Sequence, residues 1–373
     1  MTQESKQNRF SARDPIIQDA VVVIMAGGAG TRFWPASTLA SPKQFLAFFS
    51  ERSLLQQAYD RVSDWVDPER ILVLTSKAHV DLCRQQLPNL APYQVIGEPE
   101  RKDTAAAVAL AALLAQKRFG DPTMMVLAAD HLMEPASEVK RTFGAALEGA
   151  SQGDALYTLG IEPLFPSTGF GYLQLGEEET QIDGIAIHAL HNFVEKPDHE
   201  KAKHYLQSGD YLWNSGMFFW RTSTILNEFQ KNLPEHLEIL STCIRADKND
   251  DFDALLAKDF AALPRVSVDY GIMEKAERVR TAKASFQWSD VGGFPALAEH
   301  LPHDDKNNAY RGQIFPHEAS DNLVFCQDSD ETVALIGVKD LIVVRAGKRT
   351  LVVPKDRAQE IKELVGMLPI KLQ

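Results

Sequence analysis

Cysteine is scarce in this sequence, and long hydrophobic runs are missing. Cys83, Cys243 and Cys326 are scattered among 373 residues with no CxxC spacing, so we interpret them as buried or incidental thiols in a reducing compartment. No stretch approaches the roughly 18 apolar residues of a membrane span. The polar N-terminus lacks the apolar run of a signal peptide. We therefore expect a cytoplasmic protein with no membrane partner.

Positive charge is also in short supply. The chain has 39 Lys and Arg against 51 Asp and Glu, a formal net charge of −12. Such a surface repels polyanions, so we expect no nucleic-acid partner. A small anionic ligand stays possible in a locally basic cleft. The 45% hydrophobic and 24% charged residues are ordinary globular composition, which argues against disorder and collagen.

The chain predicts an α/β fold. Buried strands are expected at 21–25, 71–75 and 124–128, each a short and continuous apolar run. Helices are expected between and after them, at 53–65, 78–87, 104–119 and 222–262. This βαβα alternation predicts a mainly parallel sheet with helices on both faces, and residues 155–220 read as further strands and turns.

The pattern changes after about residue 300. Short apolar strands such as LVFCQ, VALIG, LIVVRAG and RTLVVP follow one another, and 356–364 is expected to be a helix. We predict three parts: a flexible arm at 1–15, a large catalytic domain at 16–300, and a small β-rich domain at 301–373.

The first predicted strand leads into a glycine-rich loop, Met25-Ala26-Gly27-Gly28-Ala29-Gly30-Thr31-Arg32. Glycines after a buried strand let consecutive backbone N–H groups cradle phosphate oxygens. Phe33 occupies the third glycine position of a dinucleotide fingerprint, which argues against an NAD-dependent oxidoreductase. The chain also has no P-loop GxxxxGK[ST]. A tight turn without a ligand is the plain alternative.

Two cations accompany this loop. Arg32 follows the glycines directly, and Lys43 lies in Pro42-Lys43-Gln44. Arginine can bridge phosphate oxygens bidentately, whereas lysine acts as a point charge. Each alone could be a solvated surface cation, but together they suit polyphosphate chemistry.

GGAGTRFWP…SPKQFL resembles the GxGTRxxP…PKQ signature of sugar-1-phosphate nucleotidylyltransferases, in the variant typical of mannose-1-phosphate guanylyltransferases. The resemblance covers about residues 20–300. It implies a Rossmann-like, mainly parallel mixed sheet with a C-terminal partial β-helix, and a homodimer. The family's usual arginine after Pro-x-Ser is replaced by Thr38. The tail is too short for the cupin-type isomerase domain fused to some larger relatives, so isomerase activity is not expected.

The resemblance assigns nucleotide binding to the glycine loop and to the segment that starts the helix at 104–119. The implied residues are Ala26, Gly27, Gly28, Gly30, Thr31, Lys102, Asp103 and Thr104. Read from the residues alone, Asp103 or Thr104 is a helix N-cap. The family usually has Asn where this chain has Asp103, which adds a negative charge at the expected base contact.

Two carboxylates are candidate magnesium ligands by the same resemblance, Asp130 and Asp290. Asp130 ends a predicted buried strand, where ligands bind in open α/β sheets. Mg²⁺ prefers one or two carboxylates with phosphate oxygens and water. The alternatives are a helix cap for Asp130 and a turn aspartate for Asp290 in Trp288-Ser289-Asp290-Val291-Gly292.

The family motifs FVEKP and WNSGMF imply the sugar-phosphate site. Glu195 would accept sugar hydroxyls, Lys196 would hold the sugar phosphate, and Asn214 has donors and acceptors for hydroxyls. Gly169 precedes an aromatic turn that the family places against the sugar. The segment 267–275, SVDYGIMEK, reads mostly as a structural helix lining the cleft.

The expected reaction is transfer of GMP from GTP to α-D-mannose 1-phosphate, giving GDP-mannose and pyrophosphate. Mg²⁺ is the expected cofactor, and Arg32, Lys43, Asp130 and Asp290 are the expected catalytic set. The alternatives are a nucleotidyltransferase for a heptose or glucose 1-phosphate and a non-catalytic scaffold. A scaffold would typically lose the Arg–Lys–Asp set, which this chain retains.

Overall fold

The computed structural model describes residues 10, 14–28, 30–153, 155–248 and 251–373. This part of the chain divides into two compact units. Unit 1 comprises residues up to 26, 58–128 and 133–288, and unit 2 comprises 27–57, 129–132 and 289–373. Most of the predicted arm at 1–15 lies outside the described residues, but Phe10 is buried and Asp14 caps the first helix.

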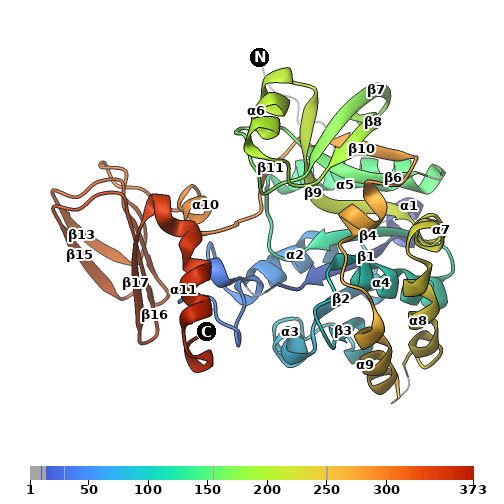
Figure 1. Ribbon diagram of the computed structural model, residues 1–373, viewed down its shortest axis with the longest axis horizontal. Coiled ribbons are helices and arrows are strands. Elements are labelled where there is room, and N and C mark those ends of the chain that lie inside the picture. The colour runs from blue at the N-terminus through green and yellow to red at the C-terminus, as the bar shows by residue number, and fades with distance from the viewer. Residues whose placement is uncertain (1–9, 11–13, 29, 154, 249–250) are drawn as a thin grey trace. The chain divides into compact units, whose positions relative to one another are not determined.

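A mixed sheet forms the centre of unit 1 (Figure 1). Nine strands of the described chain form it in the order β3-β2-β1-β4-β9-β6-β10-β8-β7. Their bounds are β1 Val21–Ala26, β2 Ile71–Ser76, β3 Val95–Glu98, β4 Thr123–Ala128, β6 Leu156–Ile161, β7 Tyr172–Ile182, β8 Ile185–Val194, β9 Tyr211–Arg221 and β10 Val279–Lys283. Strands β3, β2, β1 and β4 are parallel, and β9 runs antiparallel to both β4 and β6. The predicted fold class is confirmed.

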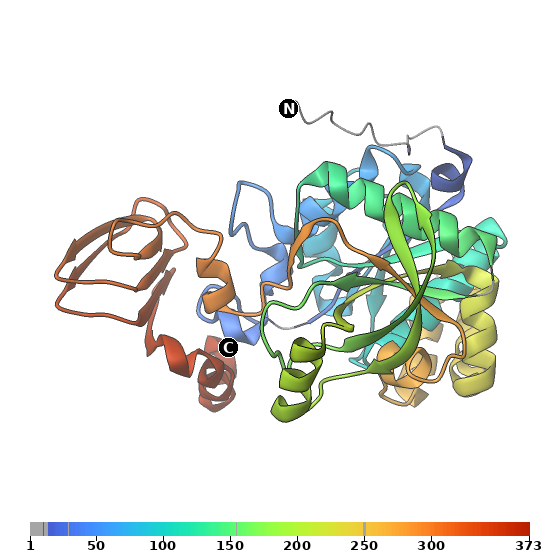
Figure 2. The same cartoon turned by 90° about the horizontal axis from the view of Figure 1, so that it is seen from above.

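Helices cover both faces of this sheet, as Figure 2 shows for α5 on one side and α7 and α8 on the other. The helices of unit 1 are α1 Pro15–Asp19, α3 Val80–Gln86, α4 Thr104–Phe119, α5 Ala136–Gln152, α6 His199–Ser208, α7 Thr222–Asn232, α8 Pro234–Arg245 and α9 Phe252–Ala262. Helix α2, Leu54–Ser63, and the short strands β5, Leu132–Glu134, and β11, Gln287–Ser289, span the boundaries between the units.

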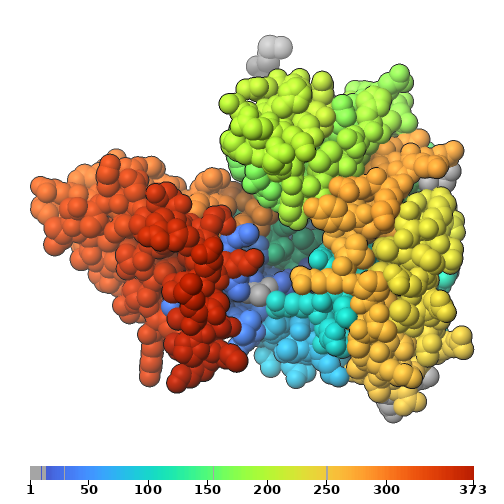
Figure 3. Space-filling model, viewed as in Figure 1, coloured from blue at the N-terminus to red at the C-terminus, as the bar shows by residue number. Residues whose placement is uncertain are grey.

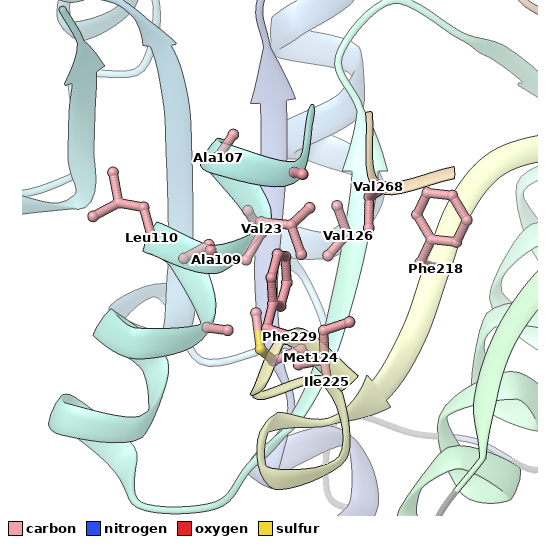
Figure 4. Packing of buried hydrophobic residues seen from close by; sticks show 14 of the residues in the cluster. Val23, Ala107, Ala109, Leu110, Met124, Val126, Phe218, Ile225, Phe229 and Val268 are labelled. Atoms are coloured by element: carbon pink, nitrogen blue, oxygen red, sulfur yellow. The ribbon is translucent and has the colours of Figure 1, made fainter. Parts of the chain in front are cut away.

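Helix α4 is unusual because it is apolar on almost every side. Its sequence TAAAVALAALLA combines the best helix former with small side chains, so the helix packs closely against its neighbours. Figure 4 shows Ala107 and Ala109 of this helix on one side of Val23 of the sheet, and Val126 on the other side, within one apolar cluster. Phe229 and Ile225 of α7 close the same cluster. The predicted bounds of 104–119 are confirmed.

Unit 2 contains stacked short strands that belong to two sheets. Strands β12 Ala309–Arg311, β14 Leu323–Cys326 and β16 Leu341–Ala346 pair in parallel, and β17 Arg349–Pro354 pairs antiparallel to β16. Strands β13 Gln313–His317 and β15 Thr332–Ile336 form the second parallel pair. Buried Asn308 and Asn322 stack at one turn, where Asn322 Nδ2 donates to Asn308 Oδ1 at 2.9 Å. These parallel rungs are the β-helix-like tail that was expected.

The predicted helix at 356–364 is present and changes type along its length. Residues Lys355–Glu360 form a 3₁₀ helix, and the α-helix α11 follows directly at Ile361–Met367. The buried side chains explain the change. Ala358 and Ile361 are three residues apart, which suits a 3₁₀ turn, whereas Ile361 and Val365 are four apart, which suits an α-helix.

The segment after β1 shares an apolar core with the C-terminal residues. Phe33, Trp34 and Phe48 pack in one cluster with Phe294 of the short helix α10, Phe294–Ala298, and with Ile361. The segment 27–57 therefore belongs to the same compact unit as residues 289–373.

The scarce cysteines are buried and free, as expected. Burial raises the pKa of Cys83 and of Cys243 to about 12, so both stay thiols. Of the helices in the described part of the chain, none combines the length and apolar character needed to cross a membrane.

Candidate active site

The glycine-rich loop that follows β1 has left-handed backbone at two positions. Gly28 has φ +98° and Gly30 has φ +58°, a region that favours glycine. A Cβ at Gly30 would lie 2.9 Å from the backbone nitrogen of Lys43. Glycine at position 30 thus lets the loop approach the segment that carries Lys43. Thr31–Phe33 then turn as a 3₁₀ helix, which places Arg32 on an exposed corner.

Lys43 is the centre of a polar cluster within unit 2. Its ammonium Nζ lies 2.9 Å from Asp130 Oδ2 and donates to the backbone carbonyls of Asp290, at 3.0 Å, and Val291, at 3.1 Å. The structure therefore brings together Lys43, Asp130 and Asp290, which are far apart in the sequence. Arg32 also reaches this segment, because its guanidinium donates to the carbonyl of Gly292 at 3.4 Å.

Asp130 is held ionised by its neighbours. Burial raises the pKa of its carboxyl, but the charges of Lys43 and His131 and the hydrogen bond from Lys43 outweigh that effect, so the pKa is lowered. His131 Nε2 is 3.9 Å from Asp130 Oδ1, which makes the histidine a neighbour of the carboxylate.

A cavity of about 250 Å³ lies beside this cluster. We call it the cation pocket, and its described lining residues are Gly30, Thr31, Arg32, Phe33, Lys43, Gly292 and Lys362. Arginine and lysine supply every charged side chain in that set. Lys362 belongs to α11 and was not predicted, since nothing in its local sequence distinguishes it from a surface lysine.

A second polar group lies at the end of β8 in unit 1. Lys196 Nζ is 2.8 Å from Glu195 Oε1, and the backbone N–H of Glu195 donates to Glu274 Oε1 at 3.0 Å. The Glu195 side chain is only 9% exposed, and its Oε2 has no hydrogen-bond partner among the described residues. A Cβ at Gly171 would meet that oxygen, so any larger residue there would displace the Glu195 carboxylate.

Asn214 and Asp269 complete this group, which we call the carboxyl cluster (Glu195, Lys196, Asn214, Asp269 and Glu274). Asn214 Oδ1 accepts from the hydroxyl of Thr158 at 2.8 Å, and Nδ2 donates to Asp269 Oδ1 at 3.0 Å. Burial and the charge of Glu195 raise the pKa of Asp269 to about 7. Asp269 was not among the predicted site residues, because the segment 267–275 reads mostly as a structural helix. The available signal was that Asp269 is an acidic residue within one of the family motifs.

Of the other predicted residues, Gly27 belongs to unit 2, and Ala26, Lys102, Asp103, Thr104 and Gly169 belong to unit 1. Asp103 is the N-cap of α4 with φ 69°, and Lys102 Nζ donates to the carbonyl of Ala261 at 2.8 Å. Thr104 Oγ1 accepts from the backbone N–H of Val268 at 2.9 Å, which ties the start of α4 to the segment that carries Asp269. Gly169 donates its N–H to Ser167 Oγ at 3.1 Å.

Comparison with known proteins decides the family. A nucleotidyl transferase model matches residues 21–307, and a model of the mannose-phosphate isomerase/GMP-like β-helix domain matches 318–368. This chain belongs to the nucleotidyl transferase family. The first match includes both the cation pocket's loop and the carboxyl cluster, and the second confirms the β-helix-like tail.

Several named proteins resemble this nucleotidyl transferase over most of its length. Mannose-1-phosphate guanylyltransferases of Klebsiella pneumoniae and Escherichia coli are each 38% identical over 349 residues, which is 93% of this chain and 73% of theirs. A crystal structure from Thermus thermophilus, titled mannose-1-phosphate geranyltransferase, has a TM-score of 0.83 and 33% identity. It covers 94% of this chain and 99% of its own.

The residues of this nucleotidyl transferase fit a divalent cation of the magnesium type. Asp130 offers an ionised carboxylate, and the backbone of Asp290 is held by the same lysine. No group of three or more acidic, histidine or cysteine side chains gathers as a metal site within the described ranges. Mg²⁺ accepts one or two carboxylates together with phosphate oxygens and water, so the Asp130 carboxylate is a suitable ligand for it.

Proposed function

We propose that this chain transfers the guanylyl group of GTP to mannose 1-phosphate, forming GDP-mannose and releasing pyrophosphate. The observation that carries the proposal is the arrangement in unit 2. One lysine ammonium contacts the Asp130 carboxylate and the Asp290 carbonyl, with Arg32 and a left-handed glycine loop beside it. The relatives named mannose-1-phosphate guanylyltransferase support the choice of sugar and nucleotide.

The chemistry requires positioning and charge neutralisation. A phosphate oxygen of the sugar phosphate attacks the α-phosphorus of GTP in line, forming a new P–O bond. The bond from that phosphorus to the β-phosphate oxygen breaks, and pyrophosphate leaves with the electron pair. The attacking oxygen is already anionic, so no strong general base is needed.

Each side chain has a role in this proposal. Arg32 and Lys43 stabilise negative charge on the α-phosphate and the leaving pyrophosphate. The glycine-rich loop, with Lys102, Asp103 and Thr104, binds the nucleotide. Glu195 and Asn214 select sugar hydroxyls next to Gly169, and Lys196 orients the attacking phosphate.

Magnesium is part of the same proposal. Asp130 and Asp290 would hold it, and the ion would supply charge neutralisation on the phosphate oxygens.

A homodimer is also proposed. The exposed apolar side chains Phe315, Ile336, Met367 and Ile370 of unit 2 support it, and sedimentation velocity tests it.

A pyrophosphate-release assay tests the reaction. The full chain with Mg²⁺ is given each nucleoside triphosphate with mannose, glucose or heptose 1-phosphate. We expect GTP with mannose 1-phosphate to give the highest kcat/KM. Faster pyrophosphate release with another pair would identify that pair as the substrates instead. No release with any pair would favour a non-catalytic scaffold.

One substitution tests the assigned chemistry. Arg32→Ala should lower kcat at least about 100-fold, because it removes a charge that acts in the transition state. The melting temperature should change little, since Arg32 is exposed. Lys348→Ala, which removes an exposed cation from the β16–β17 turn, is the matched control. Normal turnover in Arg32→Ala would refute the role.

A further inference from the structure

We propose that Lys362 is a third cation for the nucleotide phosphates, supplied by the C-terminal β-rich part of the chain. The inference rests on the proposed function and adds a binding residue to it. Lys362 lines the cation pocket with Arg32 and Lys43, although it lies in α11 near the end of the chain. Figure 3 shows the red C-terminal residues beside the blue segment that follows β1.

The position of Lys362 is fixed by buried neighbours. Ile361 and Val365, one helical turn apart, pack in the same apolar cluster as Phe33 and Trp34. Phe33 directly follows Arg32. The helix that carries Lys362 is therefore packed against the turn that carries Arg32. This shared apolar core holds both cations at the wall of the same cavity.

Hydrogen bonds at the C-terminus strengthen that anchor. The indole N–H of Trp34 donates to the carbonyl of Leu372 at 2.7 Å. The backbone N–H of Leu39 donates to the carbonyl of Gln373 at 2.8 Å. Leu372 and Gln373 are thus hydrogen-bonded to the segment between Arg32 and Lys43. These bonds hold the residues that follow α11 close to the segment that follows the glycine loop.

Charge balance shows what Lys362 would do. The charge of Lys43 already faces the Asp130 carboxylate, and its Nζ donates to two carbonyls. Lys362 is exposed and has no hydrogen bond or ion pair with any residue that the structure describes. Its ammonium is available to the pocket as a point charge, which is how lysine binds phosphate. The ligand class that fits is a polyphosphate, either the triphosphate of the nucleotide or pyrophosphate.

The test measures binding and turnover separately. Inorganic pyrophosphate and GTP, each with Mg²⁺, are titrated calorimetrically into the full chain and its Lys362→Met and Lys362→Arg variants. Because one partly solvated charge is removed, we expect Lys362→Met to weaken both affinities about 10-fold. Lys362→Arg should stay within about threefold of the wild type, since it keeps the charge. Lys348→Met, an exposed lysine of the same unit, is the matched control.

Steady-state kinetics distinguish a phosphate ligand from a structural residue. Lys362→Met should raise the KM for GTP about 10-fold and leave the KM for mannose 1-phosphate unchanged. Wild-type affinity for pyrophosphate in Lys362→Met, or an equal loss in Lys348→Met, would overturn the proposal. If the wild type binds pyrophosphate but transfers no nucleotide, the proposed function fails while the binding data still decide the role of Lys362.

Discussion

Replacing Asp269 by Asn should change how the stability of this protein depends on pH. Asp269 lies in the carboxyl cluster, where it accepts a hydrogen bond from Asn214 at 3.0 Å and lies close to Glu195. Asparagine has nearly the same shape and keeps an oxygen that can accept that bond. The substitution therefore removes the titration of the carboxyl and preserves its packing.

The size of the effect follows from the pKa. Burial, and then Glu195, raise the pKa of Asp269 from 3.8 to about 7 in the folded protein. Because the folded-state value is the higher one, the stability that this carboxyl contributes is complete below about pH 4 and is lost as the pH rises to 7. Within that window, each rise of one pH unit lowers the free energy of unfolding by about 1.4 kcal/mol. Between pH 5 and 8 the wild type should therefore lose about 3 kcal/mol relative to Asp269→Asn.

Urea unfolding at half-unit intervals between pH 5 and 8 measures this difference. The free energy of unfolding of Asp269→Asn minus that of the wild type should rise up to about pH 7 and then level off. Asp210→Asn, which alters an exposed aspartate in the same unit, should give a flat difference. A flat difference for Asp269→Asn as well would refute the argument that Asp269 is buried beside a charged Glu195.

Two further substitutions test other parts of unit 1. Arg118→Met should destabilise the fold by about 3 to 5 kcal/mol, because Arg118 and Asp247 form a pair only 4% and 3% exposed. Thermal or urea unfolding measures this, and Asp247→Leu added to Arg118→Met should recover part of the loss. Gly171→Ala should weaken mannose 1-phosphate binding at least about 10-fold, because the new Cβ would displace the Glu195 carboxylate that is proposed to accept sugar hydroxyls. Isothermal titration with mannose 1-phosphate measures this. The control is Gly153→Ala, where the nearest atom to the new Cβ is 4.0 Å away, and equal affinity in the two variants would contradict the prediction.

Much of the fold could be predicted because its signals are local. Helix α4 occupies the predicted residues, since an alanine-rich segment after an aspartate cap favours a helix in almost any context. Strands β1, β2 and β4 lie within a residue of their predicted positions because each is a short apolar run. The helix predicted at 356–364 is also present, but its division into a 3₁₀ helix and the α-helix α11 depends on which side chains the neighbouring core accepts, and a single sequence does not reveal that.

The candidate site could likewise be predicted only in part. The amino-acid sequence shows which residue types are available: the glycine loop, Arg32, Lys43 and the acids of the family motifs. The fold brings Lys43 to Asp130 and the Asp290 backbone, buries Asp269 beside Glu195, and places Lys362 at the cation pocket. The physical reason is that charge, burial and pKa depend on neighbours in space. Here those neighbours come from segments far apart in the chain, which no local pattern records.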